Sequence, residues 1–243
     1  MTDFTQACIE ANTEVHSALI TNFNISLLEK SEQGAGGDIS SKADLLAEDI
    51  FVKHLSRFGA IESEESGLIG KEKVNIIIDP LDGSVNFASR FPYYGTSVAM
   101  LDGDGTVESV QVCNLANGDI FIKEKQERVK HGSLYSDILH NRETLSIPET
   151  GLFERAYAYP ELVIGLQKVG YKFRSPGATA LSLAYAQDAT FFLFMGTSRI
   201  YDIVAGLALC EGMEVIVEEE YVIVSQSKNI AKNIENIIHR SII

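Results

Sequence analysis

The spacing of apolar residues changes at about residue 74, and this change restricts the chain to folds that layer helices against a sheet. Before it, apolar residues recur at helical spacing over residues 4–28 and 43–58, which predicts two amphipathic helices. Ser41 is placed to cap the second helix and Gly59 to end it. The short β-rich runs that follow are separated by turn residues and predict a mostly antiparallel sheet. These runs cover residues 74–78, 96–101, 107–112 and 120–123.

The second part of the chain predicts a mixture of both element types. Strands are expected at residues 156–159 and 191–194, with two more near the C-terminus, and helices at 178–186, 203–210 and 229–239. The chain has no repeats and no low-complexity linker. This order favours an α+β or layered α/β body of two abutting halves, residues 1–130 and 131–243, in one compact unit.

The composition is that of an ordinary globular protein, and its charge limits the possible partners. With 243 residues, 45% of them hydrophobic, the chain can bury a full core without disulfides or a structural metal. The formal net charge of -14 argues against nucleic acid, which binds clusters of Lys and Arg. Because the chain is acidic, a phosphate substrate would require bound divalent cations that reverse the local field.

The apolar runs, the N-terminus and the cysteines predict a cytoplasmic protein. No stretch approaches the ~20 apolar residues of a membrane span, so no membrane partner is expected. The N-terminus lacks the basic and apolar run of a signal peptide. Cys8, Cys113 and Cys210 lie far apart, which predicts neither a zinc site nor a disulfide framework and fits a reducing compartment.

The hexapeptide D-P-L-D-G-S, which begins at Asp79, directly follows an apolar strand. Asp79 therefore lies where the strand leaves the core, and Pro80 keeps the strand from continuing. Two carboxylates three residues apart, with the Leu81 carbonyl between them, can converge on magnesium, which prefers oxygen ligands. Gly83 lets the backbone approach an anion, and a short helix starting at Ser84 would direct free N–H groups toward it. The alternative is a favourable turn without a further role.

Three other acidic residues are candidate partners of this turn, and each has a simpler interpretation. Glu64 lies in an acidic stretch that would also suit a solvated loop. Asp202 occupies an expected helix N-cap, where capping alone would explain it. Asp44 falls in the first turn of a predicted helix, where the helix dipole favours an acid.

These segments, in this order, resemble the inositol monophosphatase family within the fructose-1,6-bisphosphatase superfamily of metal-dependent, lithium-sensitive sugar phosphatases. The resemblance covers nearly the whole chain. It is most specific at D-P-L-D-G-S-V-N-F, which is similar to the family pattern D-P-[IL]-D-G-[TS]-x-N-F. Supporting segments are E-E-S at 64–66, D-I-S-S-K-A-D at 38–44, R-S-P-G-A-T-A-L at 174–181 and Y-D-I-V-A-G at 201–206.

The resemblance implies an αβαβα sandwich, a homodimer and a site for two or three Mg²⁺ ions. It implies one ion held by Glu64, Asp79 and the Leu81 carbonyl. A second would be held by Asp79, Asp82 and Asp202, and a third, weaker ion would share Glu64 through water. Ser84, hydrogen-bonded to Asp44, would orient and deprotonate the attacking water, so Asp44, Ser84 and Glu64 are the expected catalytic residues. Asp82, Gly83 and Ser84 would face the phosphate.

Departures from the family pattern bear on the substrate. The family's Trp before the last metal-binding Asp is Tyr201, which still supplies a large aromatic side chain. The Glu with which animal inositol phosphatases grip inositol hydroxyls has no counterpart in residues 192–196. Arg199 precedes Asp202 by three residues, which is similar to the archaeal branch that cleaves both inositol monophosphate and fructose bisphosphate.

The remaining candidates concern the substrate side of the site. Arg199 and Arg174 would bind a second phosphate or sugar hydroxyls, with an ion pair inside the chain as the alternative. Gly177, Ala178 and Thr179 would line the sugar side. Residues 34–37 resemble the mobile loop of the family, with an inert linker as the alternative.

The expected activity is hydrolysis of small phosphorylated metabolites, with inositol 1-phosphate as the first candidate substrate and fructose 1,6-bisphosphate as the second. One alternative is a 3'-phosphoadenosine 5'-phosphate phosphatase, which needs room and a stacking surface for adenine. The other is a non-catalytic scaffold that keeps the fold. A scaffold would not need the full set of Asp44, Glu64, Asp79, Asp82, Ser84 and Asp202.

Overall fold

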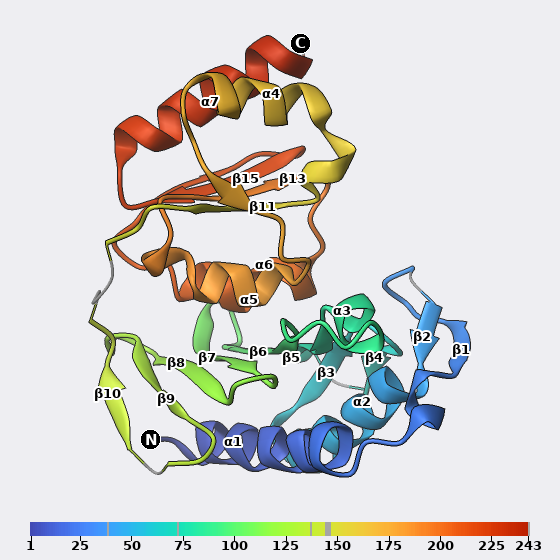
Figure 1. Cartoon of the computed structure of the whole chain (residues 1–243). Helices are drawn as coiled ribbons and strands as arrows, with labels where there is room; N and C mark the ends of the chain where they lie inside the picture. The colour runs from blue at the N-terminus through green and yellow to red at the C-terminus, as the bar shows by residue number, and fades with distance from the viewer. Residues whose placement is uncertain (38, 72, 137, 144–146, 243) are drawn as a thin grey trace.

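Two sheets stack one above the other, with helices outside and between them (Figure 1). The computed structural model describes residues 1–37, 39–71, 73–136, 138–143 and 147–242. The larger sheet has the strand order β10 (Leu139–Asn141), β9 (Lys130–Ser133), β8 (Asp119–Glu124), β7 (Val107–Asn114), β6 (Gly95–Leu101), β5 (Val74–Asp82), β3 (Ala60–Ser63) and β4 (Gly67–Ile69). Only the β3–β5 pair in this sheet is parallel, which confirms the predicted antiparallel character.

The smaller sheet has five strands and mixed pairing. Its order is β12 (Phe173–Arg174), β11 (Gly151–Glu154), β13 (Phe192–Met195), β15 (Tyr221–Ser225) and β14 (Glu214–Val217). The first three strands are parallel, β15 runs against them, and β14 pairs antiparallel with β15. A separate two-stranded ribbon joins β1 (Lys30–Gln33) to β2 (Ile39–Ser41). Asp38, the first residue of the 38–44 segment, lies outside the described residues.

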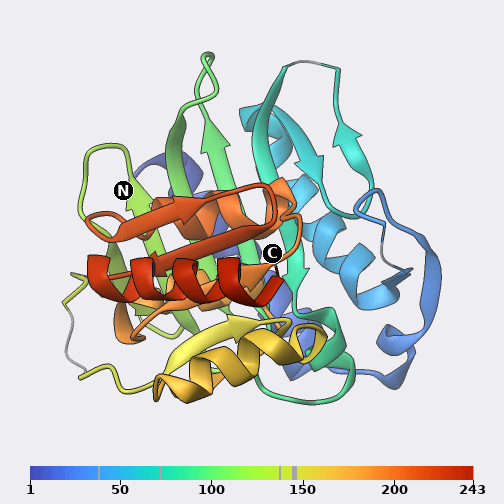
Figure 2. The ribbon, with the colours of Figure 1, turned by 90° about the horizontal axis from the view of Figure 1, so that it is seen from above.

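Three pairs of helices complete the layers. The pairs are α1 (Asp3–His16) with α2 (Lys42–Leu55), α5 (Thr179–Ala184) with α6 (Ile200–Ala208), and α4 (Pro160–Lys168) with α7 (Lys228–Ile242). Seen from above, α4 and α7 lie across the smaller sheet (Figure 2). The α5–α6 pair lies between the two sheets, and α1 and α2 cover the far face of the larger one. This αβαβα order confirms the sandwich expected from the resemblance.

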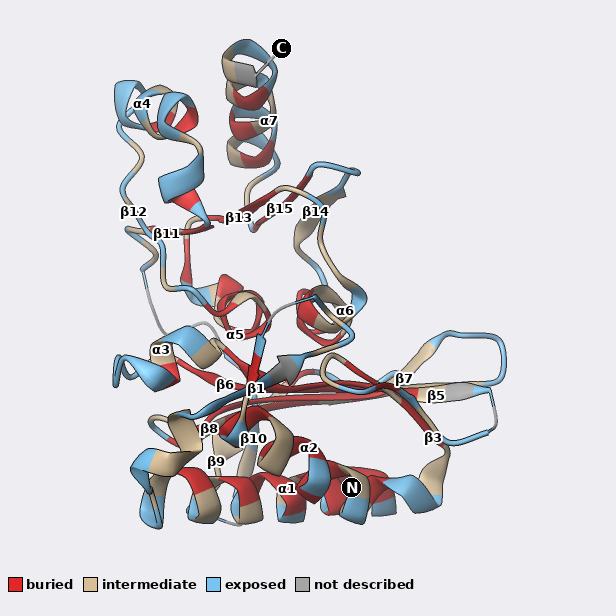
Figure 3. Ribbon diagram, turned by 90° about the vertical axis from the view of Figure 1, so that its right-hand side faces the viewer, coloured by how far each residue is buried: buried red, intermediate tan, exposed pale blue. Residues whose placement is uncertain are grey.

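Alternation along the strands explains why both faces of each sheet need a helical layer. In β5, Ile76 and Ile78 pack toward α1 and α2, whereas Ile77 packs toward α5 and α6. In β13, Leu193 packs toward α4 and α7, whereas Phe192 packs on the α5–α6 side. Strands buried on both faces read as continuous apolar runs. The buried faces of the helices turn toward the sheets, as Figure 3 shows.

The predicted helix over residues 4–28 is too long. Helix α1 ends at His16, a π-helical turn covers Ser17–Thr21, and a separate 3-10 turn covers Ile25–Leu28. Asn22 donates its side-chain amide to the Ser17 carbonyl, and Asn24 accepts a hydrogen bond from the Ser26 N–H. Such local bonds of Asn compete with the helical ladder.

The predicted strand over residues 156–159 is also wrong. The strand is β11, which ends at Glu154, and a 3-10 turn follows at Ala156–Ala158. Arg155 lies between them with φ +60, a left-handed conformation that stops a strand. The predicted boundary at residue 130 falls on the first residue of β9, which still pairs with β8. The division into two halves therefore stays a prediction. Within the described ranges, no helix is both long and apolar enough to cross a bilayer.

Candidate active site

The D-P-L-D-G-S segment forms the end of β5 and the start of α3 (Ser84–Ala88). The sequence predicted that the strand would stop at Pro80, and this is wrong. The strand continues to Asp82, which pairs again with Gly95 after an irregularity in register. Gly83 then takes φ +84, and α3 begins at Ser84 as expected. A Cβ on Gly83 would lie 3.0 Å from the Ala178 Cβ. Glycine therefore meets both a backbone and a packing requirement at this turn.

Three carboxylates from separate elements converge beside this turn. Oxygen atoms of Glu64, Asp79 and Asp202 all lie within 4.8 Å of one another. Glu64 follows β3, Asp79 lies in β5, and Asp202 is the third residue of α6 rather than its N-cap, because the extended backbone of Arg199 precedes the helix. Asp79 is 2% exposed and Asp202 6%. An all-oxygen set of acidic groups fits a hard divalent cation such as Mg²⁺.

Burial and mutual repulsion disfavour the ionised form of this cluster. Burial holds the pKa of Asp79 well above its ordinary value, and the nearby charges of Glu64, Asp82 and Asp202 add to the rise. Burial also raises the pKa of Asp82 to about 8. Such a group of acids becomes stable in ionised form when positive charge enters among them.

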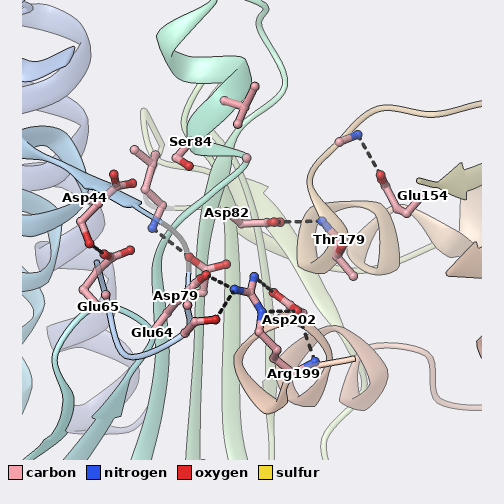
Figure 4. Close-up of a pocket in the computed structure, with 18 of the residues that line it drawn as sticks. Asp44, Glu64, Glu65, Asp79, Asp82, Ser84, Glu154, Thr179, Arg199 and Asp202 are labelled. Carbon is pink, nitrogen blue, oxygen red and sulfur yellow. Dashed lines mark hydrogen bonds and ion pairs between the residues drawn. The ribbon is translucent and has the colours of Figure 1, made fainter. Parts of the chain in front are cut away.

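The Arg199 side chain lies among these acids (Figure 4). Its Nη1 is 2.7 Å from Glu64 Oε1, and its Nε and Nη2 donate to the two oxygens of Asp202 at 3.0 Å. Nη1 also donates to the Gly36 carbonyl at 3.2 Å. The ion pair that the sequence left as an alternative for Arg199 is therefore present.

Both oxygens of Asp82 are bound by backbone N–H groups. Its two oxygens accept hydrogen bonds from the N–H groups of Thr179 at 2.9 Å and Leu181 at 2.8 Å. Both donors belong to the first turn of α5, whose N–H groups have no partner within the helix. Asp82 therefore ties β5 of the larger sheet to α5, and Figure 4 shows it directed at Thr179.

Asp44 and Ser84 line the same cavity, but the expected hydrogen bond between them is not formed among the described residues. Asp44 is instead the third residue of α2, and its Oδ2 accepts bonds from the Ser41 N–H at 2.6 Å and hydroxyl at 2.7 Å. This capping box holds the carboxylate toward its own helix. Burial raises the pKa of Asp44.

The glycine segment packs directly against the acidic cluster. The N–H groups of Ala35 and Gly36 donate to the carbonyls of Glu65 and Glu64, each at 2.7 Å. A Cβ on Gly36 would lie 2.7 Å from Glu64 Cγ. The segment thus follows the backbone of the acidic loop closely enough to require glycine at position 36.

These elements surround a cavity of about 590 Å³. Of the residues predicted for the site, it is lined by Asp44, Glu64, Asp79, Leu81, Asp82, Gly83, Ser84, Gly177, Thr179, Arg199 and Asp202. Ala178 is not in the lining and is buried beneath it at 2% exposure. Arg174 was predicted to bind substrate, but it lies on β12, an edge strand. Its side chain is exposed outside the cavity and donates to the Phe173 carbonyl.

The far wall of the cavity holds residues that the sequence did not point out: Glu154, Arg155, Tyr157, Phe194 and Thr197. Glu154 is 2% exposed and accepts bonds from the Ser182 hydroxyl at 2.5 Å and the Gly177 N–H at 2.8 Å. Burial raises its pKa. The available signal was a polar pair at the carboxyl end of an apolar strand, the place where ligands approach parallel strands.

Proteins with a similar sequence include members from bacteria and archaea. The chain is 27% identical to the Nus factor SuhB of Xylella fastidiosa over 224 residues, which cover 83% of this chain and 76% of that protein. It is 27% identical to the fructose-1,6-bisphosphatase/inositol-1-monophosphatase of Archaeoglobus fulgidus over 186 residues, with coverages of 73% and 69%.

A solved structure has the same fold over the full length. The extragenic suppressor protein SuhB of Bartonella henselae matches with a TM-score of 0.79 and 22% identity, covering 99% of this chain and all of that one. The model of the inositol monophosphatase family matches residues 1–219, which is most of the chain. The layers of the sandwich also bring the acidic segments of the family pattern into one cavity. The match to the family model shows that the chain belongs to the inositol monophosphatase family.

Proposed function

We propose that the protein hydrolyses phosphomonoesters of small metabolites with the help of Mg²⁺. The observation that supports this most is the meeting of Glu64, Asp79 and Asp202 in one cavity, beside Asp82 and the turn into α3. Membership of a phosphatase family supports the reaction class. The homodimer and the cytoplasmic location stay predictions.

The metal ions would be held by the residues expected from the sequence. Glu64, Asp79 and the Leu81 carbonyl would bind one ion, and Asp79, Asp82 and Asp202 a second, with a third sharing Glu64. When bound, the ions supply Lewis-acid activation of water and neutralise charge on the phosphate. The acidic cluster fits this requirement because it offers only oxygen ligands.

The other residues would position the substrate and carry the proton. The phosphate would lie against Gly83 and Ser84, where the left-handed glycine leaves the backbone open to it. Ser84 would orient the attacking water, and Asp44 would accept its proton on a carboxylate oxygen. Burial raises the pKa of Asp44, which makes this carboxylate a better proton acceptor than an exposed one.

Inositol 1-phosphate is the first candidate substrate and fructose 1,6-bisphosphate the second. The absence of an acidic residue in Phe192–Met195 removes one way of holding inositol hydroxyls. Arg155 on the far wall offers a positive charge for a second phosphate. A relative that bears both sugar phosphatase names, from Archaeoglobus fulgidus, supports testing both substrates.

A phosphorylated nucleotide such as 3'-phosphoadenosine 5'-phosphate is a second candidate because of Tyr157. This side chain lines the cavity and is 84% exposed, so one face of its ring can stack on a base. A bifunctional NADP phosphatase/NAD kinase of Methanococcus maripaludis is 26% identical over 212 residues, which cover 74% of this chain and 38% of that protein.

The test is phosphate release from inositol 1-phosphate, fructose 1,6-bisphosphate and the bisphosphorylated adenosine, with and without Mg²⁺. We expect turnover that requires Mg²⁺ and falls steeply in Asp202→Asn. The matched control is Asp104→Asn, which makes the same change on an exposed loop outside the cavity. Full activity in Asp202→Asn would exclude the metal arrangement, and no turnover on any substrate would favour a scaffold.

A further inference from the structure

We propose that the Arg199 guanidinium is a built-in counter-ion of the metal-free site, and that Mg²⁺ must displace it to bind. This inference rests on the proposed function, since it concerns the same acidic cluster. It assigns Arg199 a role in setting the affinity for the metal. A role limited to holding substrate would leave that affinity unchanged.

The contacts of Arg199 are those of a cation held by the cluster. Its guanidinium binds both oxygens of Asp202 in a two-pronged pair and reaches Glu64 at 2.7 Å on the other side. The Asp202 side chain is 9% exposed and that of Glu64 12%. The Arg199 side chain itself is 34% exposed, so the pair is screened less than a fully exposed one, and the two-pronged geometry helps to hold it in place.

The same two acids belong to the set that would hold the metal. Glu64 and Asp202 are two of the three groups whose oxygens converge within 4.8 Å. A magnesium ion binds carboxylate oxygens at about 2.1 Å and demands a nearly complete oxygen shell. A guanidinium hydrogen-bonded to these carboxylates also brings a like charge close to the ion. The two cations therefore compete for the same groups.

The glycine segment is coupled to this exchange. Arg199 donates to the Gly36 carbonyl, while the Gly36 N–H donates to the Glu64 carbonyl. Departure of the guanidinium would release the first bond and leave the second in place. Metal uptake should therefore loosen one attachment of residues 34–37, and by reciprocity any ligand that loosens this segment should favour metal binding.

The experiment measures Mg²⁺ binding itself, by isothermal titration and by the Mg²⁺-dependent rise in the thermal midpoint. Arg199→Met keeps the length of the side chain and removes the charge. We expect its dissociation constant for Mg²⁺ to be roughly tenfold lower than that of the unmodified protein, within the range typical of coupled ligands. The metal-free midpoint should fall, because the cluster loses its counter-ion.

The matched control is Arg155→Met, which removes the same charge from the opposite wall of the cavity. Arg155 lines the cavity and lies over the Phe194 ring, whereas the ion pairs to Glu64 and Asp202 among the described residues come from Arg199. We expect Arg155→Met to change the dissociation constant for Mg²⁺ by less than about twofold, because Arg155 is exposed and solvent screens its charge. Equal shifts in both variants would overturn the proposal by showing a general effect of net charge.

A second variant keeps the test decisive if Arg199→Met folds poorly. Arg199→Lys keeps the charge but lacks the planar guanidinium. Its affinity for Mg²⁺ should therefore lie between those of the unmodified protein and Arg199→Met. If the unmodified protein binds Mg²⁺ and neither Arg199 variant binds it more tightly, the counter-ion role is wrong and the proposed function stands. If the unmodified protein binds no Mg²⁺, the proposed metal site fails, and the counter-ion role fails with it.

Discussion

The cavity contains two kinds of buried acid, which the fold neutralises in different ways. We call Glu64, Asp79 and Asp202 the facing carboxylates, because their oxygens converge on one another. We call Asp82 and Glu154 the amide-bound carboxylates, because both oxygens of each accept bonds from neutral donors, which are backbone N–H groups in every case but the Ser182 hydroxyl. Hydrogen-bond donors supplied by the fold satisfy the second kind. Asp79 accepts one backbone N–H bond, from Leu81, and Asp202 accepts bonds from the Arg199 guanidinium, but the oxygens of the first kind also repel one another. A cation among them would therefore stabilise their ionised form.

Among the tests of this difference, the substitution Asp79→Asn has the largest expected effect. We expect kcat/KM to fall by roughly 10³-fold, because about 4 kcal/mol of cation-dependent stabilisation of the transition state is lost. The metal-free protein should be at least as stable as before, since the change removes a charge that burial disfavours. Steady-state kinetics and urea unfolding in EDTA measure the two effects. A large loss of metal-free stability would contradict the distinction between the two kinds of acid.

Glu154→Ala should instead lower the stability of the metal-free protein. It leaves the Gly177 N–H and the Ser182 hydroxyl without their acceptor, which costs about 2 kcal/mol of unfolding free energy for buried donors. The loss should be the same with and without Mg²⁺. Glu154→Gln is the control, because its carbonyl can still accept one of the two bonds. Equal stability of both variants in urea unfolding would show that the acceptor is not what matters.

The third test uses pH. Between about pH 4 and 8 the folded protein holds a proton on Asp82 that the unfolded chain has lost, because the pKa of this group rises from 3.8 to about 8. The unfolding free energy of the metal-free protein should therefore fall as the pH rises through this range. We expect the thermal midpoint to drop by a few degrees from pH 7 to pH 8 in EDTA, the change expected for about 1 kcal/mol in a chain of this size.

Millimolar Mg²⁺ should flatten that profile, because a bound cation favours the ionised carboxylates. Asp82→Asn is the matched variant, and its midpoint in EDTA should depend less on pH than that of the unmodified protein. A metal-free midpoint that rises over the same range in the unmodified protein would refute the assignment of the raised pKa.

The smallest expected effect belongs to Gly36→Ala. The new methyl group would lie 2.7 Å from Glu64 Cγ and 3.2 Å from Arg199 Nη1, so it would shift one of the facing carboxylates. We expect Mg²⁺ affinity to weaken by roughly fivefold, equivalent to about 1 kcal/mol of overpacking. Gly103→Ala is the control, since its Cβ would meet nothing within 4 Å. Titration calorimetry distinguishes the two, and identical affinities would remove the segment from the metal site.

The local parts of the site could be predicted from sequence, whereas the long-range parts could not. The strand, the turn at Gly83 and the helix beginning at Ser84 follow from adjacent residues, so their order was readable. The family resemblance then connected Glu64 and Asp202 to this turn. The ion pair of Arg199 depends on a contact between residues 135 positions apart, from Glu64 to Arg199, which no local pattern encodes.

The far wall of the cavity also contains features that local sequence patterns did not predict. A strand was predicted over residues 156–159, but the left-handed backbone of Arg155 ends β11 just before this stretch, and Arg155 and Tyr157 line the cavity. An L residue adopts this conformation rarely, so propensity alone argued against it. Arg174 looked suitable by position in a family segment, yet an edge strand exposes it outside the cavity. A backbone conformation decided the first case and the place of a strand in its sheet decided the second, and local sequence patterns specify neither.

The attachment of Asp82 to the first turn of α5 also bears on how the protein is made. Asp82 leaves the ribosome about 100 residues before its donors Thr179 and Leu181, and the last facing carboxylate, Asp202, follows later still. A chain whose synthesis has reached only the larger sheet therefore lacks part of the cavity lining, including Asp202, which the proposed mechanism requires. Under that mechanism, phosphatase activity in a preparation would report only molecules in which α5 and α6 have joined the larger sheet.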